Sequence, residues 1–554
     1  MRPSMIEDLW YKNDVIYSLD LETFMDGNGD GVGDFTGLIS RLDYLQSLGV
    51  DVIWLAPFQP SPNRDNGYDI RDYFGVDPRH GSSGDFVEFI QHAKKRGMRV
   101  ILDLVVNHTS DQHPWFKAAR RDKTSPYRDW YLWSKKRPKA WNKGMVFPGV
   151  QKATWTRDPI SKEYYHHRFF SFQPDLNMDN PAVRAEIRRV MGYWLQLGVD
   201  GFRVDAVPFI LEGAPLATGG AKLRFDYLSE MRTFLQWRTS DAVLLGEANV
   251  MPKENRHYFG DEGDGIHMMF NFYANQHLFY ALASADTRPL QKALRETKQI
   301  PATSQWGQFL RNHDELDLGR LKAPQRAAVF KRFGPKREMQ LYDRGIRRRL
   351  ASMLGDRRHL ELANSVMFSL PGAPVIRYGD EIGMGENLAL KERDAVRTPM
   401  QWANEPNAGF SSARRLVHPV IRDGLFGYSQ VNVEDQRRDP GSLLNWMTKI
   451  IRARKECREI GWGDWELVRT GSPHVLGMCY AWRGRRVLTL HNFNSQPVEI
   501  SFAIEGEGSD RLADVLDKND SKVRADGQHH IRLPEYGYRW YRVGGLNYAL
   551  HDDH

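Results

Sequence analysis

Short apolar runs alternate with amphipathic segments along most of this 554-residue chain. Leu38, Leu42 and Leu45 share one helical face before Gly49, which ends that helix. The apolar runs predict strands at Val15–Leu19, Val50–Pro57, Arg99–Val106, Gly201–Val207, Val243–Ala248, Met268–Tyr273, Gly307–Arg311 and Val375–Tyr378. Eight strands that alternate with helices predict a closed (β/α)8 TIM barrel rather than an open doubly wound sheet.

Three stretches depart from this alternation. Residues 110–180 are rich in Trp, Tyr, Lys and Pro without a helical period, which predicts an inserted subdomain over the active face of the barrel. Residues 315–370 predict a mostly helical excursion. From residue 461 to 554, short alternating strands and a hairpin turn at Trp482–Arg485 predict a C-terminal antiparallel β-sandwich. The barrel would then comprise residues 1–109 and 181–460.

Charge and cysteine content exclude several classes of protein. The 77 basic and 70 acidic residues give a net charge of +7 and are interspersed, so we expect no nucleic-acid partner. Two cysteines, Cys457 and Cys479, make no disulfide framework and favour a reducing compartment. The N-terminus has no apolar signal region and no stretch is long enough to span a bilayer. We therefore expect a cytoplasmic protein with no membrane partner.

Acidic residues follow three of the predicted strands: Asp205, Glu247 and Asp314. In a parallel barrel these strand ends open onto one face, so the three carboxylates should converge there. Arg203 lies two residues before Asp205, on the same face of the strand, and should lower the pKa of that carboxyl group. Glu247 emerges from an apolar run, where burial raises a carboxyl pKa and suits a general acid.

Paired carboxylates at the end of a barrel predict glycoside chemistry. Two carboxyl groups about 5 Å apart are the arrangement of retaining glycosidases, in which one attacks the anomeric carbon and the other serves as acid and then base. Asp314 would accept hydrogen bonds from sugar hydroxyls in the transition state. His108 and His313, at strand ends beside these acids, suit hydroxyl recognition.

Five segments resemble the signature regions of the α-amylase superfamily, glycoside hydrolase family 13. They are Asp103–His108, Gly201–Asp205, Gly246-Glu247, Asn312-His313-Asp314 and Gln173–Asn177. The resemblance implies Asp205 as nucleophile, Glu247 as acid/base and Asp314 as transition-state stabiliser. It implies that Tyr68, Asp69, His108, Arg203 and His313 hold the non-reducing glucose. It also implies that Arg397 pairs with Asp69 to close the pocket, which favours terminal glucose over long chains.

Within the superfamily, nearly the whole chain resembles the trehalose synthases, which interconvert maltose and trehalose. One stretch departs from their pattern, because Gly213–Gly220 is short and lacks the polar residues that wall off their acceptor site. An open acceptor site would admit water, so we expect hydrolysis of trehalose, and of maltose, to glucose through a covalent glucosyl-Asp205 intermediate. The alternative is isomerisation by intramolecular transfer. Oligo-1,6-glucosidase activity, with which Val207 is compatible, comes third.

Two other classes fit the residues less well. Non-catalytic transporter partners of this superfamily have lost catalytic acids, whereas this chain keeps all three. Polysaccharide-acting amylases need an open cleft, which an Asp69–Arg397 pair would close. The resemblance leaves a small-molecule disaccharide as the expected partner and allows a homo-oligomer.

A glycine-rich turn near the N-terminus suggests a Ca²⁺ loop. Residues 26–34 place oxygen ligands at alternate positions, although Gly37 at the twelfth position rules out an EF-hand. The resemblance implies one structural Ca²⁺ on Asp26, Asn28, Asp30, the Val32 carbonyl and Asp34. It implies a second on Asn107, Asp175, the Phe209 and Ile210 carbonyls and Glu212, which would pin residues 110–180 to the barrel. No organic cofactor is expected.

Overall fold

The computed structural model describes residues 9–212, 223–506 and 508–544. Eight parallel strands close into a barrel in the order β1-β14-β10-β9-β8-β7-β3-β2. They are β1 (Ile16–Leu19), β2 (Val52–Leu55), β3 (Arg99–Leu104), β7 (Gly201–Val204), β8 (Val243–Gly246), β9 (Met268–Phe270), β10 (Gln305–Phe309) and β14 (Ala373–Arg377). Each coincides with one of the predicted strands, so the (β/α)8 prediction is confirmed.

Some strand ends differ from the prediction for a local reason. Strand β9 stops at Phe270 because Asn271 caps the next helix, α10 (Phe272–Ser284). The Oδ1 atom of Asn271 accepts a hydrogen bond from the Ala274 amide at 3.0 Å. Strand β10 begins two residues earlier than predicted, at Gln305. The buried side chain of Gln305 donates a hydrogen bond to the Lys12 carbonyl oxygen at 3.0 Å.

Alternate residues of the strands form two different cores. Ile16, Trp54, Ile101 and Leu245 point into the barrel, where they form one buried cluster with residues of the other strands. Their neighbours along the strands, such as Ile53, pack outward beneath the helices. The barrel is therefore a filled core, open to chemistry only at the ends of its strands.

Helices cover the outside of the barrel. Ser82 and Asp85 form a capping box at the start of α4, and Asn180 caps α6 ahead of Pro181. The helices of this layer and its loops are α1 (Leu21–Phe24), α2 (Phe35–Ser40), α3 (Leu42–Leu48), α4 (Ser83–Lys95), α6 (Pro181–Gln196), α7 (Val207–Ile210), α8 (Asp226–Arg238), α9 (Asn255–Phe259), α10 (Phe272–Ser284), α11 (Arg288–Glu296), α13 (Leu350–Leu354), α14 (Arg357–Ser369), α15 (Val433–Arg438), α16 (Leu443–Glu456) and α17 (Glu459–Trp462).

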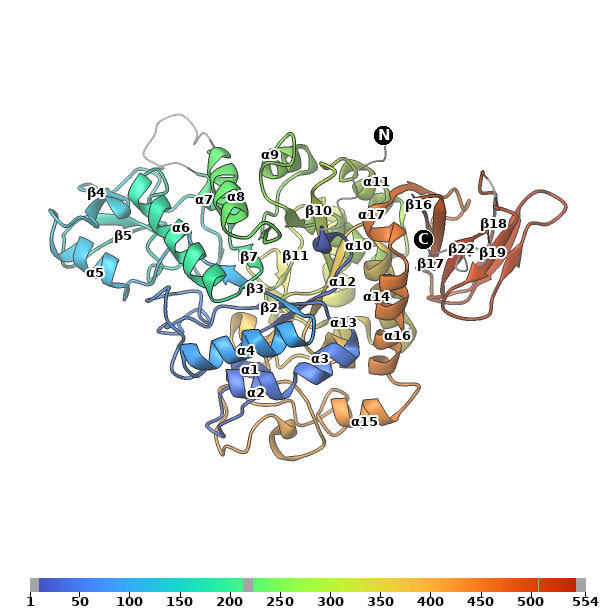
Figure 1. Cartoon of the computed structure of the whole chain (residues 1–554), viewed down its shortest axis with the longest axis horizontal. Coiled ribbons are helices and arrows are strands. Elements are labelled where there is room, and N and C mark those ends of the chain that lie inside the picture. Colours follow the sequence, from blue (N-terminus) through green and yellow to red (C-terminus); the bar gives the residue numbers. More distant parts are fainter. Residues whose placement is uncertain (1–8, 213–222, 507, 545–554) are drawn as a thin grey trace.

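The insertion after β3 lies at one end of the molecule (Figure 1). It contains α5 (Pro114–Arg121) and a small antiparallel sheet of β4 (Trp133–Ser134), β6 (Tyr164–His166) and β5 (Trp155–Arg157). Aromatic rings fill its interior: Phe116 stacks on Trp133 and meets Tyr165 edge-on. The Trp and Tyr content of this stretch is therefore used mainly for packing.

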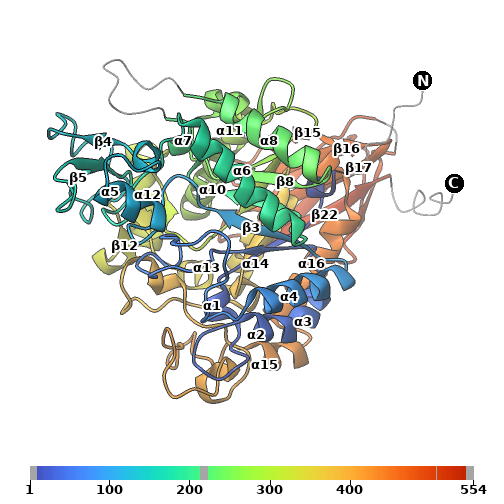
Figure 2. The ribbon, with the colours of Figure 1, turned by 60° about the vertical axis from the view of Figure 1, so that its left-hand side comes forward.

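The excursion after β10 contains strands as well as helices. A three-stranded sheet, β11 (Leu316–Asp317), β13 (Gly345–Ile346) and β12 (Gln340–Leu341), accompanies α12 (Ala323–Phe333). The predicted excursion was too long, because its last part is α14, which packs against β10 and β14 as a helix of the barrel layer. Figure 2 shows β12 close to the insertion.

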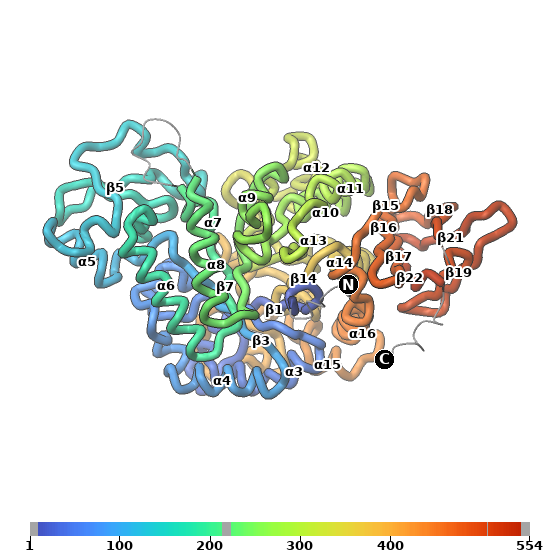
Figure 3. Tube along the Cα trace, turned by 45° about the horizontal axis from the view of Figure 1, so that its top comes forward, coloured from blue at the N-terminus to red at the C-terminus, as the bar shows by residue number. Residues whose placement is uncertain are grey.

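The C-terminal β domain lies at the opposite end from the insertion, as Figure 3 also shows. Its six-stranded sheet has the order β15-β16-β17-β22-β19-β20, and β18 pairs with β21. The strands are β15 (Asp464–Leu467), β16 (Val475–Trp482), β17 (Arg485–Asn492), β18 (Val498–Phe502), β19 (Arg511–Asp514), β20 (Ser521–Lys522), β21 (His529–Leu533) and β22 (Tyr538–Val543). Both sheets contribute to one core, and the predicted hairpin turn joins β16 to β17 through Arg483 and Gly484, both at positive φ.

Among the described residues, no helix combines the length and the apolar character needed to cross a bilayer.

Candidate active site

The three predicted carboxylates line one cavity of about 570 Å³ at the carboxyl ends of the barrel strands. Its volume is in the range of small-molecule sites. Asp205 and Glu247 directly follow β7 and β8, whose register pairs Val204 with Gly246. The backbone amides of Asp205 and Glu247 donate to the Leu104 and Val204 carbonyls, which extends the ladder to the site. Asp314 follows β10 by five residues.

One guanidinium holds the two proposed reacting carboxylates. Arg203 contacts Asp205 at 2.6 Å through Nη1 and Glu247 at 2.8 Å through Nη2. Nη1 also contacts Asp103 at 2.6 Å, and the Arg203 side chain is only 1% exposed. Asp205 and Glu247 are therefore close together around one guanidinium, and double displacement at one anomeric carbon requires two carboxyl groups close to each other.

The prediction for the pKa of Asp205 was wrong in direction. Burial raises the pKa of Asp205 to about 6, and the nearby guanidinium of Arg203 only partly opposes this. Burial, opposed by Arg203 and reinforced by Asp205 and Asp314, raises the pKa of Glu247 to about 7. The raised pKa of Glu247 agrees with the prediction that it serves as a general acid.

Asp314 has the opposite environment. Burial alone would raise its pKa, but Arg393, His313 and Arg397 hold the pKa well below its usual range. Nη1 of Arg393 and Nη2 of Arg397 lie 3.0 and 3.1 Å from the same oxygen, Oδ1. The lowered pKa keeps Asp314 ionised at neutral pH, which suits a group that accepts hydrogen bonds from hydroxyls.

Tyr68, His108 and His313 also line the cavity. The Tyr68 hydroxyl lies 2.8 Å from His313 Nε2 and donates to Asp103 at 3.1 Å, and the two rings stack 5.4 Å apart. His108 Nε2 lies 3.0 Å from the Tyr68 carbonyl oxygen. The structure thus brings these predicted sugar-binding residues together around the acids.

The predicted Asp69–Arg397 pair is absent among the ion pairs of the described residues. Asp69 is fully buried and accepts from Ser61 Oγ at 2.8 Å and from Arg64 Nε at 3.4 Å. Arg397 donates instead to the His313 carbonyl at 2.9 Å and to Asp314. Arg64, five residues from Asp69, supplies the nearer cation, so Arg397 acts on a different carboxylate.

Sequence reasoning missed two residues of this site. Asp103 touches both Arg203 and Tyr68, and burial raises its pKa to about 6. Asp103 could have been recognised in the sequence as an acidic residue inside the apolar run Ile101–Val106, on the strand face that points into the barrel core. Arg393 lines the cavity and contacts Asp314, and no pattern in the sequence marks it.

The first predicted Ca²⁺ loop folds as a series of turns, in each of which a side-chain oxygen accepts a hydrogen bond from the backbone amide two residues later. The Asn28, Asp30 and Val32 amides donate to Asp26 Oδ1, Asn28 Oδ1 and Asp30 Oδ1 at 3.0, 2.9 and 2.8 Å. Asp34 accepts from Gly27 and Gly37 and caps α2. Four side chains with oxygen atoms and one carbonyl in nine residues have the donor chemistry for Ca²⁺.

The second predicted metal site has its donors engaged by protein groups. Asp175 Oδ1 accepts from Asn107 at 3.1 Å, and Oδ2 lies 3.0 Å from His166 Nδ1. Glu212 forms an ion pair with Arg168, while the Phe209 carbonyl accepts from the Glu212 amide, and Ile210 lies within α7. In the described part of the chain, no three His, Cys, Asp or Glu side chains are placed to hold a metal ion. The same holds for residues 26–34, so both Ca²⁺ sites stay predictions.

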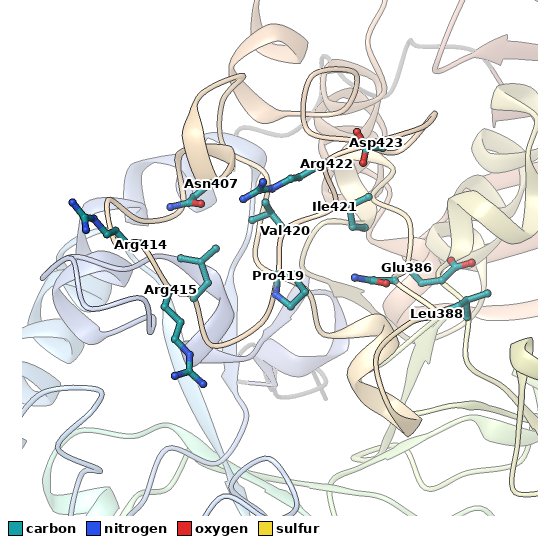
Figure 4. Close-up of a pocket in the computed structure, with 12 residues that line it drawn as sticks. Glu386, Leu388, Asn407, Arg414, Arg415, Pro419, Val420, Ile421, Arg422 and Asp423 are labelled. Atoms are coloured by element: carbon teal, nitrogen blue, oxygen red, sulfur yellow. The ribbon is translucent and has the colours of Figure 1, made fainter.

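A second hollow, of about 750 Å³, lies elsewhere, between the segments 386–388 and 414–423 (Figure 4). Arg422 extends across it toward Asn407, whereas Arg414 and Arg415 point away from each other. None of the predicted site residues lines it. The converging carboxylates Asp205, Glu247 and Asp314 therefore distinguish the candidate active site from this hollow. The acceptor-loop residues Gly213–Gly220 lie outside the described residues.

Comparison with known proteins gives a consistent result. The family described as "Alpha amylase, catalytic domain" matches residues 18–330 and 343–463, and "Sucrose hydrolase-like, C-terminal domain" matches residues 484–542. A trehalose synthase of Thermus thermophilus is 40% identical over 552 residues, which are 99% of this chain and 57% of that protein. A trehalose synthase/amylase TreS of Mycobacterium tuberculosis (strain H37Rv) is 39% identical over 543 residues, 96% of this chain and 90% of that protein.

A solved structure shares the whole architecture. The crystal structure of Bacillus licheniformis trehalose-6-phosphate hydrolase superposes with a TM-score of 0.77 at 27% identity, covering 96% of this chain and 99% of that one. The chain thus spans only a little over half of the Thermus protein but nearly all of the others.

Proposed function

This chain belongs to the alpha-amylase family, glycoside hydrolase family 13, and on that premise we propose that it interconverts maltose and trehalose by intramolecular glucosyl transfer. The observation that carries the proposal is the single guanidinium of Arg203 holding Asp205 and Glu247 beside each other in one cavity. The relatives named trehalose synthase favour transfer over the net hydrolysis that the sequence led us to expect. That expectation rested on residues 213–220, which the structure does not describe.

The first half of the reaction breaks the glycosidic bond. Protonated Glu247 gives its proton to the glycosidic oxygen while a carboxylate oxygen of Asp205 attacks the anomeric carbon. The products are a β-glucosyl ester of Asp205 and one free glucose. Asp314, kept ionised by two guanidiniums, accepts hydrogen bonds from the hydroxyls of the reacting ring as positive charge develops.

The second half re-forms a bond to the same glucose. Starting from trehalose, that glucose attacks through its 4-hydroxyl and gives maltose; starting from maltose, it attacks through its anomeric hydroxyl and gives trehalose. In both directions ionised Glu247 takes the proton of the attacking hydroxyl, and Asp205 leaves as a carboxylate. Water attacking the ester would give a second free glucose, so the cavity must exclude it.

A product assay tests the proposal. Trehalose and maltose are incubated separately with the protein, and glucose and both disaccharides are resolved over time, with Asp205→Asn as the inactive control. We expect maltose from trehalose and trehalose from maltose. Glucose as the sole product from both disaccharides would contradict isomerisation and would favour hydrolysis as the function. Faster release of glucose from isomaltose than from either would favour an oligo-1,6-glucosidase.

A further inference from the structure

Arg393 lies where three loops meet over the mouth of the barrel. It belongs to the short helical turn Glu392–Val396 in the loop after β14. Its guanidinium carbon is 5.0 Å from the ring centroid of Phe147, in the insertion after β3. It is 5.5 Å from the ring centroid of Tyr342, at the tip of the β12–β13 hairpin after β10. We call residues 144–147 and 341–344 the roof.

The two halves of the roof are packed against each other. Phe147 and Tyr342 have their ring centroids 4.7 Å apart and are 1% and 5% exposed. Arg344 reaches across, its Nη1 donating to the Val146 carbonyl at 2.7 Å, and pairs with Asp317 at 2.9 Å. Residues 144–147, Arg344 and Arg393 all line the catalytic cavity. The roof therefore forms part of the wall of this cavity.

Arg393 connects this roof to the catalytic machinery. Its Nη1 contacts Asp314 Oδ1 at 3.0 Å, and its Nε donates to Glu315 Oε2 at 2.8 Å. Glu315 in turn lies 3.6 Å from Arg344. Arg397 also holds Asp314, so Asp314 keeps a cationic partner without Arg393. Arg393 differs from Arg397 in that it also lies against the rings of Phe147 and Tyr342 in the roof.

We propose that Arg393 is a positioning residue that keeps the roof closed over the acceptor glucose and thereby sets how the glucosyl enzyme divides between transfer and hydrolysis. The inference rests on the proposed function. With the roof closed, the freed glucose stays and its hydroxyl attacks the ester. With the roof loosened, glucose leaves, water enters, and the ester yields a second glucose.

The chemistry of the side chain makes the role specific to arginine. A planar guanidinium can bond two carboxylates through its edge while its faces lie against aromatic rings. Lysine keeps the charge but offers one point donor, so it should retain a contact with Asp314 and lose the simultaneous hold on Glu315 and on the rings. The Arg393→Lys variant thus separates the effect of charge from the effect on the roof.

The test compares wild type, Arg393→Ala, Arg393→Lys and Lys331→Ala, an exposed residue of α12 that serves as control. Each is given trehalose together with isotopically labelled free glucose. In Arg393→Ala we expect the ratio of glucose to maltose to rise about tenfold, because the guanidinium loses its contacts with both roof rings. We also expect labelled glucose in the maltose, because the acceptor now exchanges with solvent. Arg393→Lys should show the same change, with total turnover nearer to wild type than Arg393→Ala, and Lys331→Ala should match wild type.

Hydrogen exchange provides a readout independent of the products. In both Arg393 variants the backbone amides of the roof should exchange faster with solvent deuterium. The amides of the barrel strands should keep their protection. The melting temperature serves as a check that each variant is folded. An unchanged product ratio, or unchanged exchange at the roof, overturns the proposal. If wild type itself makes only glucose, the isomerase function fails, and exchange at the roof then decides the role of Arg393 by itself.

Discussion

At the scale of residues, burial raises the pKa of three acids that share Arg203, and Arg203 opposes this shift. One buried guanidinium contacts three carboxyl groups, Asp103, Asp205 and Glu247, so a single positive charge faces up to three negative ones. Burial raises the pKa of all three groups, to about 6, 6 and 7. Glu247 holds its proton to the highest pH, which is the property that a general acid needs beside an ionised nucleophile.

The role of Asp205 as nucleophile leads to a direct prediction. Asp205→Asn replaces the attacking oxygen by an amide of nearly the same shape, so the fold should persist while kcat falls by about 10³-fold or more. Steady-state turnover of trehalose, with circular dichroism as a check on folding, measures this. Activity within tenfold of wild type would overturn the assignment.

The pKa values of the pair predict a narrow pH optimum. Attack needs ionised Asp205, which favours pH above about 6, and protonation of the leaving group needs protonated Glu247, which favours pH below about 7. The profile of kcat/KM should therefore be bell-shaped, with limbs that belong to the coupled pair. Glu247→Gln should abolish the alkaline limb and slow disaccharides far more than α-glucosyl fluoride. Equal losses on both substrates would contradict the acid role.

At the scale of elements, the register of β7 with β8 places the pair of acids. Gly201 makes this register possible, because a Cβ atom there would lie 2.4 Å from the Val243 carbonyl oxygen and the residue has φ +155°. Glycine is thus required by the close approach of two barrel strands rather than by a turn.

Substitution of this glycine should disturb the site through the sheet. Gly201→Ala must push β8 away or unpair β7, so we expect a large fall in melting temperature and lost activity. Gly97→Ala is the matched control: Gly97 also has positive φ, +73°, but a Cβ there would meet nothing within 4 Å. The control should cost only about 1 kcal/mol of backbone strain. Equal melting temperatures for the two variants would refute the steric argument.

The glycine-rich loop at residues 26–34 leads to a prediction about metal. Side-chain oxygens close its consecutive turns, and bound Ca²⁺ would add stability that rises with its concentration. Millimolar Ca²⁺ should raise the melting temperature of wild type, and Asp30→Ala, which alters an exposed ligand, should remove the increase. Identical melting curves of wild type with Ca²⁺ and with chelator would exclude this site.

At the scale of the whole molecule, the C-terminal domain is anchored to the barrel layer through α14. Trp540 is fully buried and donates from Nε1 to Ser365 Oγ at 3.0 Å, and His491 Nε2 lies 3.0 Å from the same oxygen. The Tyr480 hydroxyl donates to the Ser369 carbonyl. Because α14 packs on β10 and β14, the two domains should unfold together.

Trp540 provides the test of this anchoring. Trp540→Ala should destabilise the protein by about 3–5 kcal/mol, the usual cost of deleting a large buried ring, and should lower the melting temperature of the barrel as well. Trp237→Ala is the control, because Trp237 is 86% exposed and its loss should leave the melting curve unchanged. Separate transitions for barrel and β domain in the wild-type protein would show that the domains are independent.

The sequence by itself determined the barrel and the position of its acids. Hydrophobic periodicity is a property of neighbouring residues, so Val243–Leu245 and its counterparts could be recognised as strands without knowledge of their partners. An acid at the end of such a strand must then appear at the open face of the barrel. The hairpin turn at Arg483 and Gly484 was likewise set by local backbone preference.

Only the tertiary structure decided which charges meet and how strongly they are desolvated. Arg397 is near Asp314 rather than Asp69 because separate loops bring them together, and nothing within either segment specifies that choice. The pKa of Asp205 depends on burial contributed by the entire barrel mouth, which outweighs the local effect of Arg203 that the sequence revealed. Arg393 has a role only because three distant loops converge on it. Strands and turns depend on neighbouring residues and can be read from the sequence. The pairing of charged side chains and their burial depend on contacts between distant segments, which only the folded chain provides.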